Sequence, residues 1–563
     1  MYEIGGIKLK KKSIKYRNIM KIILVFSVIV VFSVSCDKDN NDSNEGSDQF
    51  WGFGNSDKIE INNSYNDKIS EAAKDSYTYY TSEDFQSFII DQMNGNIYSI
   101  YDENYQELAN SHLQEIKELK TYTYESPLFI MNPFGTNTCG MYIYMGKSDS
   151  KLGINYTISI NDKTIADFSE SMFLSYKDKE IEGQLIGLLQ GRTNKVVLEV
   201  LDSSGNRISK KAYYFDIADL DSIKEQTLRF EFGDKVDLSR GLFAFHAKDD
   251  TRSHFLYYDN YGVVRAEIPT EMQDANTKIL QVGNNVFYGV RDDLFVLVNN
   301  LGYIENYYPW EYSDLYTEFD TDIEKNKVLF IVNASIDENC TILGLDLNTG
   351  EYKEYLNIEK LMRSPMKFDE MQVVDGKDII VNSNEMSSII RINNIYTSPV
   401  IRWIIADESL WKDSNYETLL LYKKGNFQSQ FNQKSIYYSE SRKLKEGQFY
   451  LSLFHFEDTN SQKSATSASE GGITTNGMRS FYYQYLVDES VNGYQLVKKI
   501  EIPDITTNDC MAMPYGGNVI ISIGALKEFR EYNSKGEIMS KYYMNDTNFS
   551  NPIFKYTMGR YWF

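Results

Sequence analysis

The stretch LYYDNYGVVRAEI, residues 256–268, decides the fold, because its pattern returns five more times along the chain. Each copy is an apolar strand, a turn with Asn, Asp or Gly, and a second strand, which predicts a β-hairpin. The other copies are FVLVNNLGYIENYY at 295–308, ILGLDLNTGEYKEYL at 342–356, IIRINNIYTSPVIRWII at 389–405, YYQYLVDESVNGYQLVKKIEI at 482–502 and FREYNSKGEIMSKYYM at 529–544.

A second strand pair is expected between successive hairpins, which gives four strands per unit. These further strands are expected at Lys278–Val290, Lys327–Val332, Lys377–Asn382 and Asn518–Ile523. A spacing of about 45–50 residues between four-stranded units is typical of β-propeller blades. The six copies therefore predict a six-bladed β-propeller over residues 236–563, with the tail Phe554–Phe563 as a strand that closes the ring.

One interval between copies is roughly twice the others and contains two insertions, Ser409–Gln428 and Glu457–Arg479. The second insertion is of low complexity, which is typical of a loop. A seventh blade hidden in this interval is the alternative to six.

Two further segments precede the propeller. Apolar residues recur every three or four positions from Ser82 to Lys120, which predicts a helical segment within 76–125, with Asn94–Asn96 as a candidate interruption. Alternating strand patterns then predict a small β-sandwich over 126–235. The predicted fold class is thus all-β: a six-bladed propeller after a small sandwich and a short helical segment.

The first residues have the pattern of an export signal. A lysine-rich start is followed by the apolar run Ile22–Val34, which is short for a membrane span. Ser33–Cys36 resembles a lipobox, so we expect residues 1–36 to be a lipoprotein signal peptide with Cys36 lipidated. A transmembrane anchor is the alternative reading, and Met20 is a second candidate for the start.

Residues 37–75 read as a polar tether, so the chain is expected to be exported and lipid-anchored. We expect an outer-membrane position facing the periplasm or the cell surface. The net charge of −22 disfavours nucleic acid as a partner, because phosphate contacts need a basic face. The cysteines and four histidines show no metal-ligand spacing, and the chain has no glycine-rich phosphate loop, so neither a metal nor a cofactor is predicted.

Several motifs together resemble one enzyme family. Pro127–Asn137 (PLFIMNPFGTN) and Glu182–Leu188 (EGQLIGL) are similar to the N-terminal sandwich of bacterial arylsulfotransferases. Ile379–Ile392, followed by Ile401–Ile405, looks like a central blade of that family, and Phe431–Ser435 like the segment that carries its nucleophile. The resemblance implies a sandwich followed by a six-bladed propeller, and transfer of a sulfuryl group from an aryl sulfate to a phenol through a histidine, without a nucleotide sulfate donor.

The histidines that this chemistry uses are replaced here. The family's Gly-Gln-His-Ser reads Asn-Gln-Lys-Ser, with Lys434 at the nucleophile's position, and Trp-x-His-x-Asn reads Pro-Met-Lys-Phe-Asp, with Lys367 at the histidine. Thr317 aligns with a further histidine and Asn384 with an arginine, while Arg479 fits a strand-start arginine of the family.

These replacements leave three readings of the function. A protonated lysine has no lone pair with which to attack sulfur, and a sulfamate leaves poorly, so Lys434 and Lys367 favour holding a sulfate, carboxylate or phenolate over transferring sulfur. Arg479 is a third candidate ligand contact. The first reading is therefore a small phenolic or sulfated ligand bound without chemistry. The second is an active sulfotransferase with rearranged residues, for which His455 is the nearby substitute. The third is a protein-interaction propeller at the cell surface.

Overall fold

The computed structural model describes the chain from residue 69 to residue 557 with gaps. The described ranges are 69–93, 99–172, 174–218, 229–232, 242–248, 253–271, 279–310, 316–321, 328–334, 340–363, 366–458, 478–502, 510–515, 517–523, 528–543 and 554–557. The predicted signal peptide, Cys36, most of the tether and most of the Glu457–Arg479 insertion lie outside them. Within these ranges, no helix is long and apolar enough to cross a membrane.

Two helices form the predicted helical segment, α1 (Ser82–Gln92) and α2 (Glu103–Glu118). Thr81 and Asp84 form a reciprocal capping box that fixes the start of α1. The first helix ends just before the predicted interruption at Asn94–Asn96. The apolar positions of both helices pack into one core with the sheet that follows them.

Ten strands form a sandwich of two five-stranded sheets, in the orders β1-β10-β9-β5-β6 and β2-β3-β4-β8-β7. Two of them, β1 and β2, precede the range 126–235 predicted for the sandwich. Their bounds are β1 (Ser70–Glu71), β2 (Thr78–Tyr80), β3 (Leu128–Met131), β4 (Met141–Lys147), β5 (Gly153–Ser159), β6 (Phe168–Ser171), β7 (Leu174–Ser175), β8 (Glu180–Leu185), β9 (Arg192–Leu201) and β10 (Arg207–Ile217). Alternate residues of β5 are buried, as expected of a strand with one face against a core.

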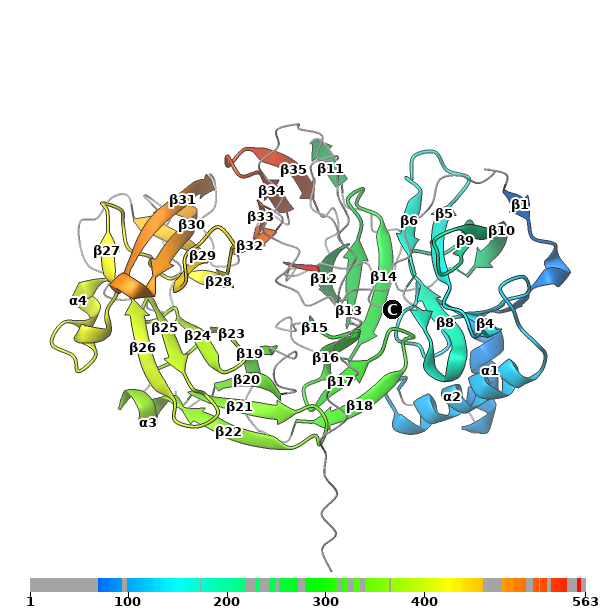
Figure 1. Cartoon of the computed structure of the whole chain (residues 1–563), viewed down its shortest axis with the longest axis horizontal. Helices are drawn as coiled ribbons and strands as arrows, with labels where there is room; N and C mark the ends of the chain where they lie inside the picture. The colour runs from blue at the N-terminus through cyan, green and yellow to red at the C-terminus, as the bar shows by residue number, and fades with distance from the viewer. Residues whose placement is uncertain are drawn as a thin grey trace, which may run out of the picture. The chain divides into compact units, whose positions relative to one another are not determined.

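Six further sheets are the blades of the propeller, and each contains four consecutively hydrogen-bonded antiparallel strands (Figure 1). Blade 1 contains β12 (Leu242–Lys248), β13 (Ser253–Tyr258) and β14 (Val264–Thr270); blade 2 contains β15 (Ile279–Val282), β16 (Asn285–Arg291), β17 (Leu294–Val298) and β18 (Ile304–Pro309); blade 3 contains β19 (Tyr316–Thr321), β20 (Val328–Ala334), β21 (Cys340–Asp346) and β22 (Tyr352–Asn357). Blade 4 contains β23 (Glu370–Val374), β24 (Asp378–Ser383), β25 (Ser388–Asn393) and β26 (Val400–Ile405); blade 5 contains β28 (Lys434–Ser439), β29 (Gln448–Asp458), β30 (Met478–Asp488) and β31 (Gly493–Ile502); blade 6 contains β32 (Cys510–Tyr515), β33 (Asn518–Ile523), β34 (Glu528–Tyr532) and β35 (Ile538–Tyr543). The repeat prediction of six blades is confirmed.

Two distant strands complete the first and last blades. The strand β36 (Phe554–Thr557) pairs with β12 and gives blade 1 its fourth strand, as predicted for the tail. The strand β11 (Arg229–Phe232) pairs with β35 at the outer edge of blade 6. That strand falls inside the range 126–235 predicted for the sandwich, although its hydrogen bonds are made with the propeller.

Apolar side chains between neighbouring blades form the propeller's core. One cluster joins blades 2 and 3, a second joins blades 3 and 4, a third joins blades 4 and 5, and a fourth joins blades 5 and 6. The near-continuous burial of middle strands such as β24 follows from having a blade on each face.

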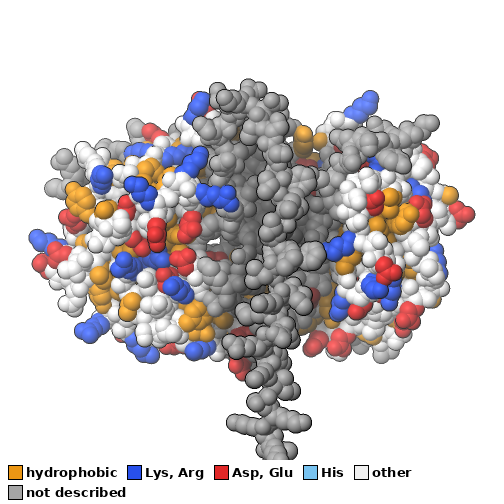
Figure 2. Space-filling model, viewed as in Figure 1, with side chains coloured by type: hydrophobic (Ala, Val, Ile, Leu, Met, Phe, Trp, Pro, Cys, Tyr) orange, Lys and Arg blue, Asp and Glu red, His pale blue; other side chains and the backbone are white. Residues whose placement is uncertain are grey.

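The long interval between hairpins contributes an extra strand to blade 5, not a seventh sheet among the described residues. The segment contains α4 (Glu408–Trp411), η4 (Glu417–Leu419) and β27 (Tyr422–Lys424), and β27 pairs in parallel with β31. The other short helices in the described ranges are α3 (Ile358–Met362), η1 (Lys74–Ser76), η2 (Lys177–Lys179) and η5 (Glu489–Val491). Among the described side chains on the face in Figure 2, those of Lys and Arg lie between those of Asp and Glu, so both signs of charge are mixed there.

Candidate functional site

Three of the residues that align with the family's site residues lie at one end of the propeller, on three consecutive blades. Thr317 lies in β19, Lys367 precedes β23, and Lys434 is the first residue of β28. These are the first strands of blades 3, 4 and 5, and each lies next to the following one. Because the blades share one strand order, their first strands begin at the same end.

Polar contacts tie these first strands together. The backbone N–H of Val373 in β23 donates to Asp320 Oδ2 of β19 at 2.8 Å. The N–H of Tyr438 in β28 donates to Gln372 Oε1 of β23 at 2.6 Å. The starts of blades 3, 4 and 5 are therefore held in a fixed relation.

Asp369 is hydrogen-bonded to Asn384 and feels the charges of Lys434 and Lys367. Burial raises the pKa of its carboxyl above the usual value, while the Asn384 N–H and the charges of Lys434 and Lys367 oppose that rise. The Asn384 backbone N–H donates to Asp369 Oδ2 at 2.7 Å. The structure thus brings three of the five predicted residues, Lys434, Lys367 and Asn384, around one carboxyl that the sequence analysis had not singled out.

The environment of this carboxyl is mixed in charge. The Lys367 side chain is exposed and that of Lys434 is half-buried. Glu385 adds a negative charge near Asp369, and Glu370 accepts hydrogen bonds from the backbone N–H groups that follow Lys434. The site therefore offers cationic donors and carboxylate acceptors side by side.

The other two predicted residues have side chains outside the described part of the structure. The backbone of Thr317 lies at an irregularity in the pairing of β19 with β20. Arg479 lies in β30, where it pairs with Glu457 of β29.

His455, the candidate substitute nucleophile, is fully buried in β29 of blade 5. Its ring lies 4.0 Å from the ring centroid of Tyr483 and 6.0 Å from that of Phe481. Elsewhere, His112 stacks on Phe88 of α1 and His254 is buried near Glu267. Each of these three imidazoles thus has a packed environment. Within the described ranges, no group of three or more metal-ligating side chains is found.

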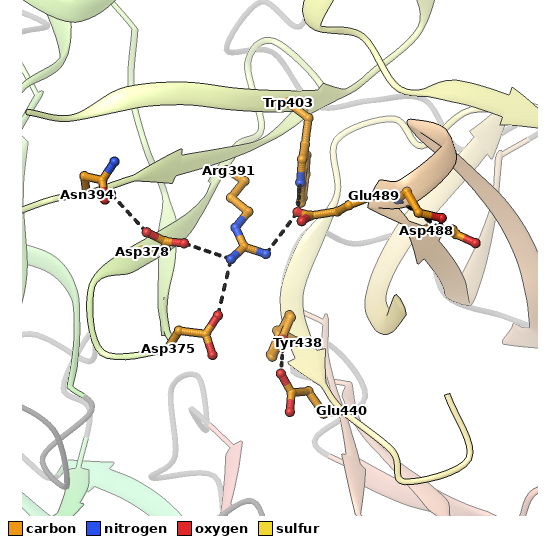
Figure 3. A network of polar contacts seen from close by, with 10 residues as sticks. Asp375, Asp378, Arg391, Asn394, Trp403, Tyr438, Glu440, Asp488 and Glu489 are labelled. Carbon is orange, nitrogen blue, oxygen red and sulfur yellow. Dashed lines mark hydrogen bonds and ion pairs between the residues drawn. The ribbon is translucent and has the colours of Figure 1, made fainter. Parts of the chain in front are cut away.

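The opposite end of blades 4 and 5 carries a second polar cluster, centred on Arg391 of β25 (Figure 3). The Arg391 guanidinium donates to Asp378 Oδ2 at 2.8 Å and to Glu489 Oε1 at 3.0 Å. The indole N–H of Trp403 donates to the same Glu489 oxygen at 2.6 Å. Asp375, a third carboxylate on Arg391, follows the end of β23, whereas Lys367 precedes its start. This cluster therefore joins two blades away from the candidate site.

Comparison with known proteins finds one family match, over part of the propeller. Residues 371–549 match the Arylsulfotransferase (ASST) family. This part of the chain is an arylsulfotransferase family domain. The matched stretch contains Asn384, Lys434 and Arg479, whereas Thr317 and Lys367 precede it. The chemistry of the arylsulfotransferase family is sulfotransfer, in agreement with the resemblance seen in the sequence.

Solved structures similar to the chain share little of its sequence. A putative 6-phosphogluconolactonase from Bacteroides fragilis is 9% identical, with 73% of this chain and 98% of that chain covered and a TM-score of 0.33. A second, from Bacteroides uniformis, is 9% identical, with coverage of 72% and 99% and a TM-score of 0.31. The Pan2 WD40 domain of Neurospora crassa is 10% identical, with coverage of 60% and 80% and a TM-score of 0.28. No curated protein matches the chain in sequence.

Proposed function

We propose that the propeller binds a small anionic or phenolic ligand beside Lys434 and Lys367, and that the sulfuryl-transfer chemistry of the arylsulfotransferase family is weakened or lost in this chain. The observation that carries this proposal is the joint action of both lysines on the Asp369 carboxyl. The two lysines come from different blades and are remote in sequence, so it is the fold that brings their charges close to one carboxyl.

The chemistry of these groups favours binding over transfer. Ammonium groups suit the oxygens of a sulfo, carboxylate or phenolate group, and a carboxylate accepts a hydrogen bond from a phenolic hydroxyl. A nucleophile must attack sulfur with a lone pair and then leave. A protonated lysine lacks the lone pair, and a lysine sulfamate is a poor leaving group.

A sulfuryl-transfer assay tests the proposal with the full chain. The assay mixes p-nitrophenyl sulfate with phenol and follows release of nitrophenolate, beside calorimetric titration of p-nitrophenyl sulfate. The variants are Lys434→Ala, Lys434→His and, as a control, Lys424→Ala, which removes an exposed lysine of β27 in the same blade.

We expect the wild type to bind p-nitrophenyl sulfate without turnover. Lys434→Ala should weaken binding and Lys424→Ala should not, whereas Lys434→His should gain turnover. Wild-type turnover that Lys434→Ala abolishes would instead establish an active sulfotransferase. Absence of binding in the wild type would overturn the ligand proposal and favour an interaction propeller.

We also propose that the chain is an exported lipoprotein anchored to the membrane through Cys36. The support is the lysine-rich start, the apolar run and the small residues before Cys36. Metabolic labelling with radioactive palmitate should mark the wild type and leave Cys36→Ala unlabelled. Equal labelling of both would contradict the assignment of Cys36.

A further inference from the structure

The backbone around Lys434 has an unusual conformation that requires support. Asn432 has φ +47° and Ser435 has φ +56°, so residues on both sides of Lys434 are left-handed. The pairing of β28 with β29 also shifts between Lys434 and Tyr437. Serine rarely adopts this conformation, and such backbone persists where surrounding groups hold it.

One support comes from the residue before Lys434. Gln433 is fully buried, and its Nε2 donates to Asn382 Oδ1 at 2.7 Å. It also donates to the carbonyl oxygens of Ser383 and Ser388, both at 3.2 Å. In return, Asn382 Nδ2 donates to the Gln433 carbonyl oxygen at 2.9 Å. Gln433 of blade 5 and Asn382 of blade 4 therefore form a reciprocal amide pair between the blades.

The second support comes after Lys434. The N–H of Ser435 donates to Glu370 Oε1 at 2.7 Å, and the N–H of Ile436 donates to Glu370 Oε2 at 2.9 Å. Glu370 is the first residue of β23 in blade 4. Blade 4 thus holds the backbone on both sides of Lys434, although Lys434 itself belongs to blade 5.

The amide pair also reaches the carboxyl at the centre of the site. Asn382 Nδ2 donates to Asn384 Oδ1 at 3.0 Å, and the Asn384 N–H donates to Asp369. A continuous chain of hydrogen bonds therefore runs from the Gln433 backbone to Asp369. Hydrogen bonds joined in a buried chain strengthen one another, so this chain favours one geometry of the segment around Lys434.

We propose that Gln433 and Asn382 are positioning residues, whose amide pair fixes Lys434 relative to Asp369. The consequence for ligand affinity rests on the proposed function, whereas the placement of Lys434 does not. Replacing one member with an apolar side chain should release the backbone at Lys434 and leave the rest of the blade folded.

Lysine labelling tests the proposal without any ligand. The full chain is acetylated under native conditions, and modification of Lys434 and Lys424 is followed by mass spectrometry. In Gln433→Met, Lys434 should be modified about tenfold faster, the factor expected for loss of one buried hydrogen-bonding group. Labelling of the exposed Lys424 should not change.

Gln430 provides a matched control in the same segment. It is buried, and its Nε2 donates to the carbonyl oxygens of Ile405 at 2.9 Å and Ser387 at 3.3 Å in blade 4. The Gln430 side chain is hydrogen-bonded to Ser387, Ile405 and Tyr485, and not to Asn382. Gln430→Met should therefore lower thermal stability without changing the labelling of Lys434, which separates positioning from general stability.

Asn382→Leu keeps the proposal testable if Gln433→Met does not fold. Either variant should accelerate labelling of Lys434, and the double variant should add little, because both act through one pair. Unchanged Lys434 labelling in a folded single variant would overturn the proposal, as would equal acceleration in Gln430→Met. If the wild type does not bind p-nitrophenyl sulfate, the proposed function fails while the labelling result still decides the positioning role.

Discussion

Arg391 of blade 4 donates a 3.0 Å hydrogen bond to Glu489 of blade 5, and its side chain is only 8% exposed. The same guanidinium faces Asp378, which is 4% exposed. Arg391→Leu would leave that buried carboxylate without its cation, which costs about 3–5 kcal/mol. We expect a loss of this size in the free energy of unfolding, measured with urea.

Arg291→Leu is the matched surface control for this measurement. Arg291 pairs with Glu271 and Asp293, but its side chain is 42% exposed. Exposed pairs contribute about 0–1 kcal/mol. Equal losses in the two variants would show that the Arg391 cluster does not hold blades 4 and 5 together.

Asp369 should make stability depend on pH. Because burial raises the pKa of its carboxyl in the folded chain, the folded state binds the proton more tightly than the unfolded state. This contribution to stability is present below the unfolded pKa of about 3.9 and is lost as pH rises through the folded value. Relative to the wild type, Asp369→Asn should therefore become more stable as pH rises above about 4, as measured by urea unfolding. The opposite trend would mean that the lysines outweigh burial.

His455 should prove dispensable for ligand binding. Its imidazole is 0% exposed and packs on Tyr483 and Phe481. His455→Phe should lower the free energy of unfolding by about 1–3 kcal/mol, because a larger ring must fit into a fully packed site. Titration with p-nitrophenyl sulfate should give the wild-type affinity. If the folded variant lost ligand binding, or lost a turnover that the wild type has, His455 would again be a candidate nucleophile.

Lys117 should fasten α2 to the sandwich. Its ammonium contacts Glu180 and lies 3.2 Å from Glu182, and its side chain is 5% exposed. Lys117→Met leaves the two carboxylates together, so we expect α2 to exchange its amide hydrogens faster and the chain to lose about 3 kcal/mol. Lys179→Met, which removes an exposed partner of Asp149, should leave exchange in α2 unchanged.

The propeller could be predicted because its outer hairpins repeat a strand, turn and strand pattern. The copy at 256–268 corresponds to β13 and β14, and the copy at 529–544 to β34 and β35. The strand β11 could not be predicted in blade 6, because its partner β35 is remote in sequence. Strands pair through backbone groups, so the order of the side chains does not reveal which strands pair. The short parallel strand β27 escaped prediction for the same reason.

The site could be predicted only in part. Alignment with the family's motifs pointed to Lys434, Lys367 and Asn384, which the structure places around Asp369. Apart from its alignment with the family's asparagine, nothing in the sequence distinguishes Asp369 from the chain's other acidic residues, because its burial arises only in the folded chain. Its place two residues after Lys367, at the family's asparagine, was the one available signal. The role of Gln433 likewise depends on a partner in another blade.

The pairing of Leu242 with Thr557, and of Arg229 with Tyr543, also has a consequence for synthesis. Blade 1 lacks its fourth strand until residues 554–557 are available, and β11 lacks its partner until β35 is available. Pairing between such distant segments is slow, and a sheet edge that is still unpaired is prone to aggregation. The sandwich strands all lie within residues 70–217, so this domain can fold early while the propeller must wait for its final strand.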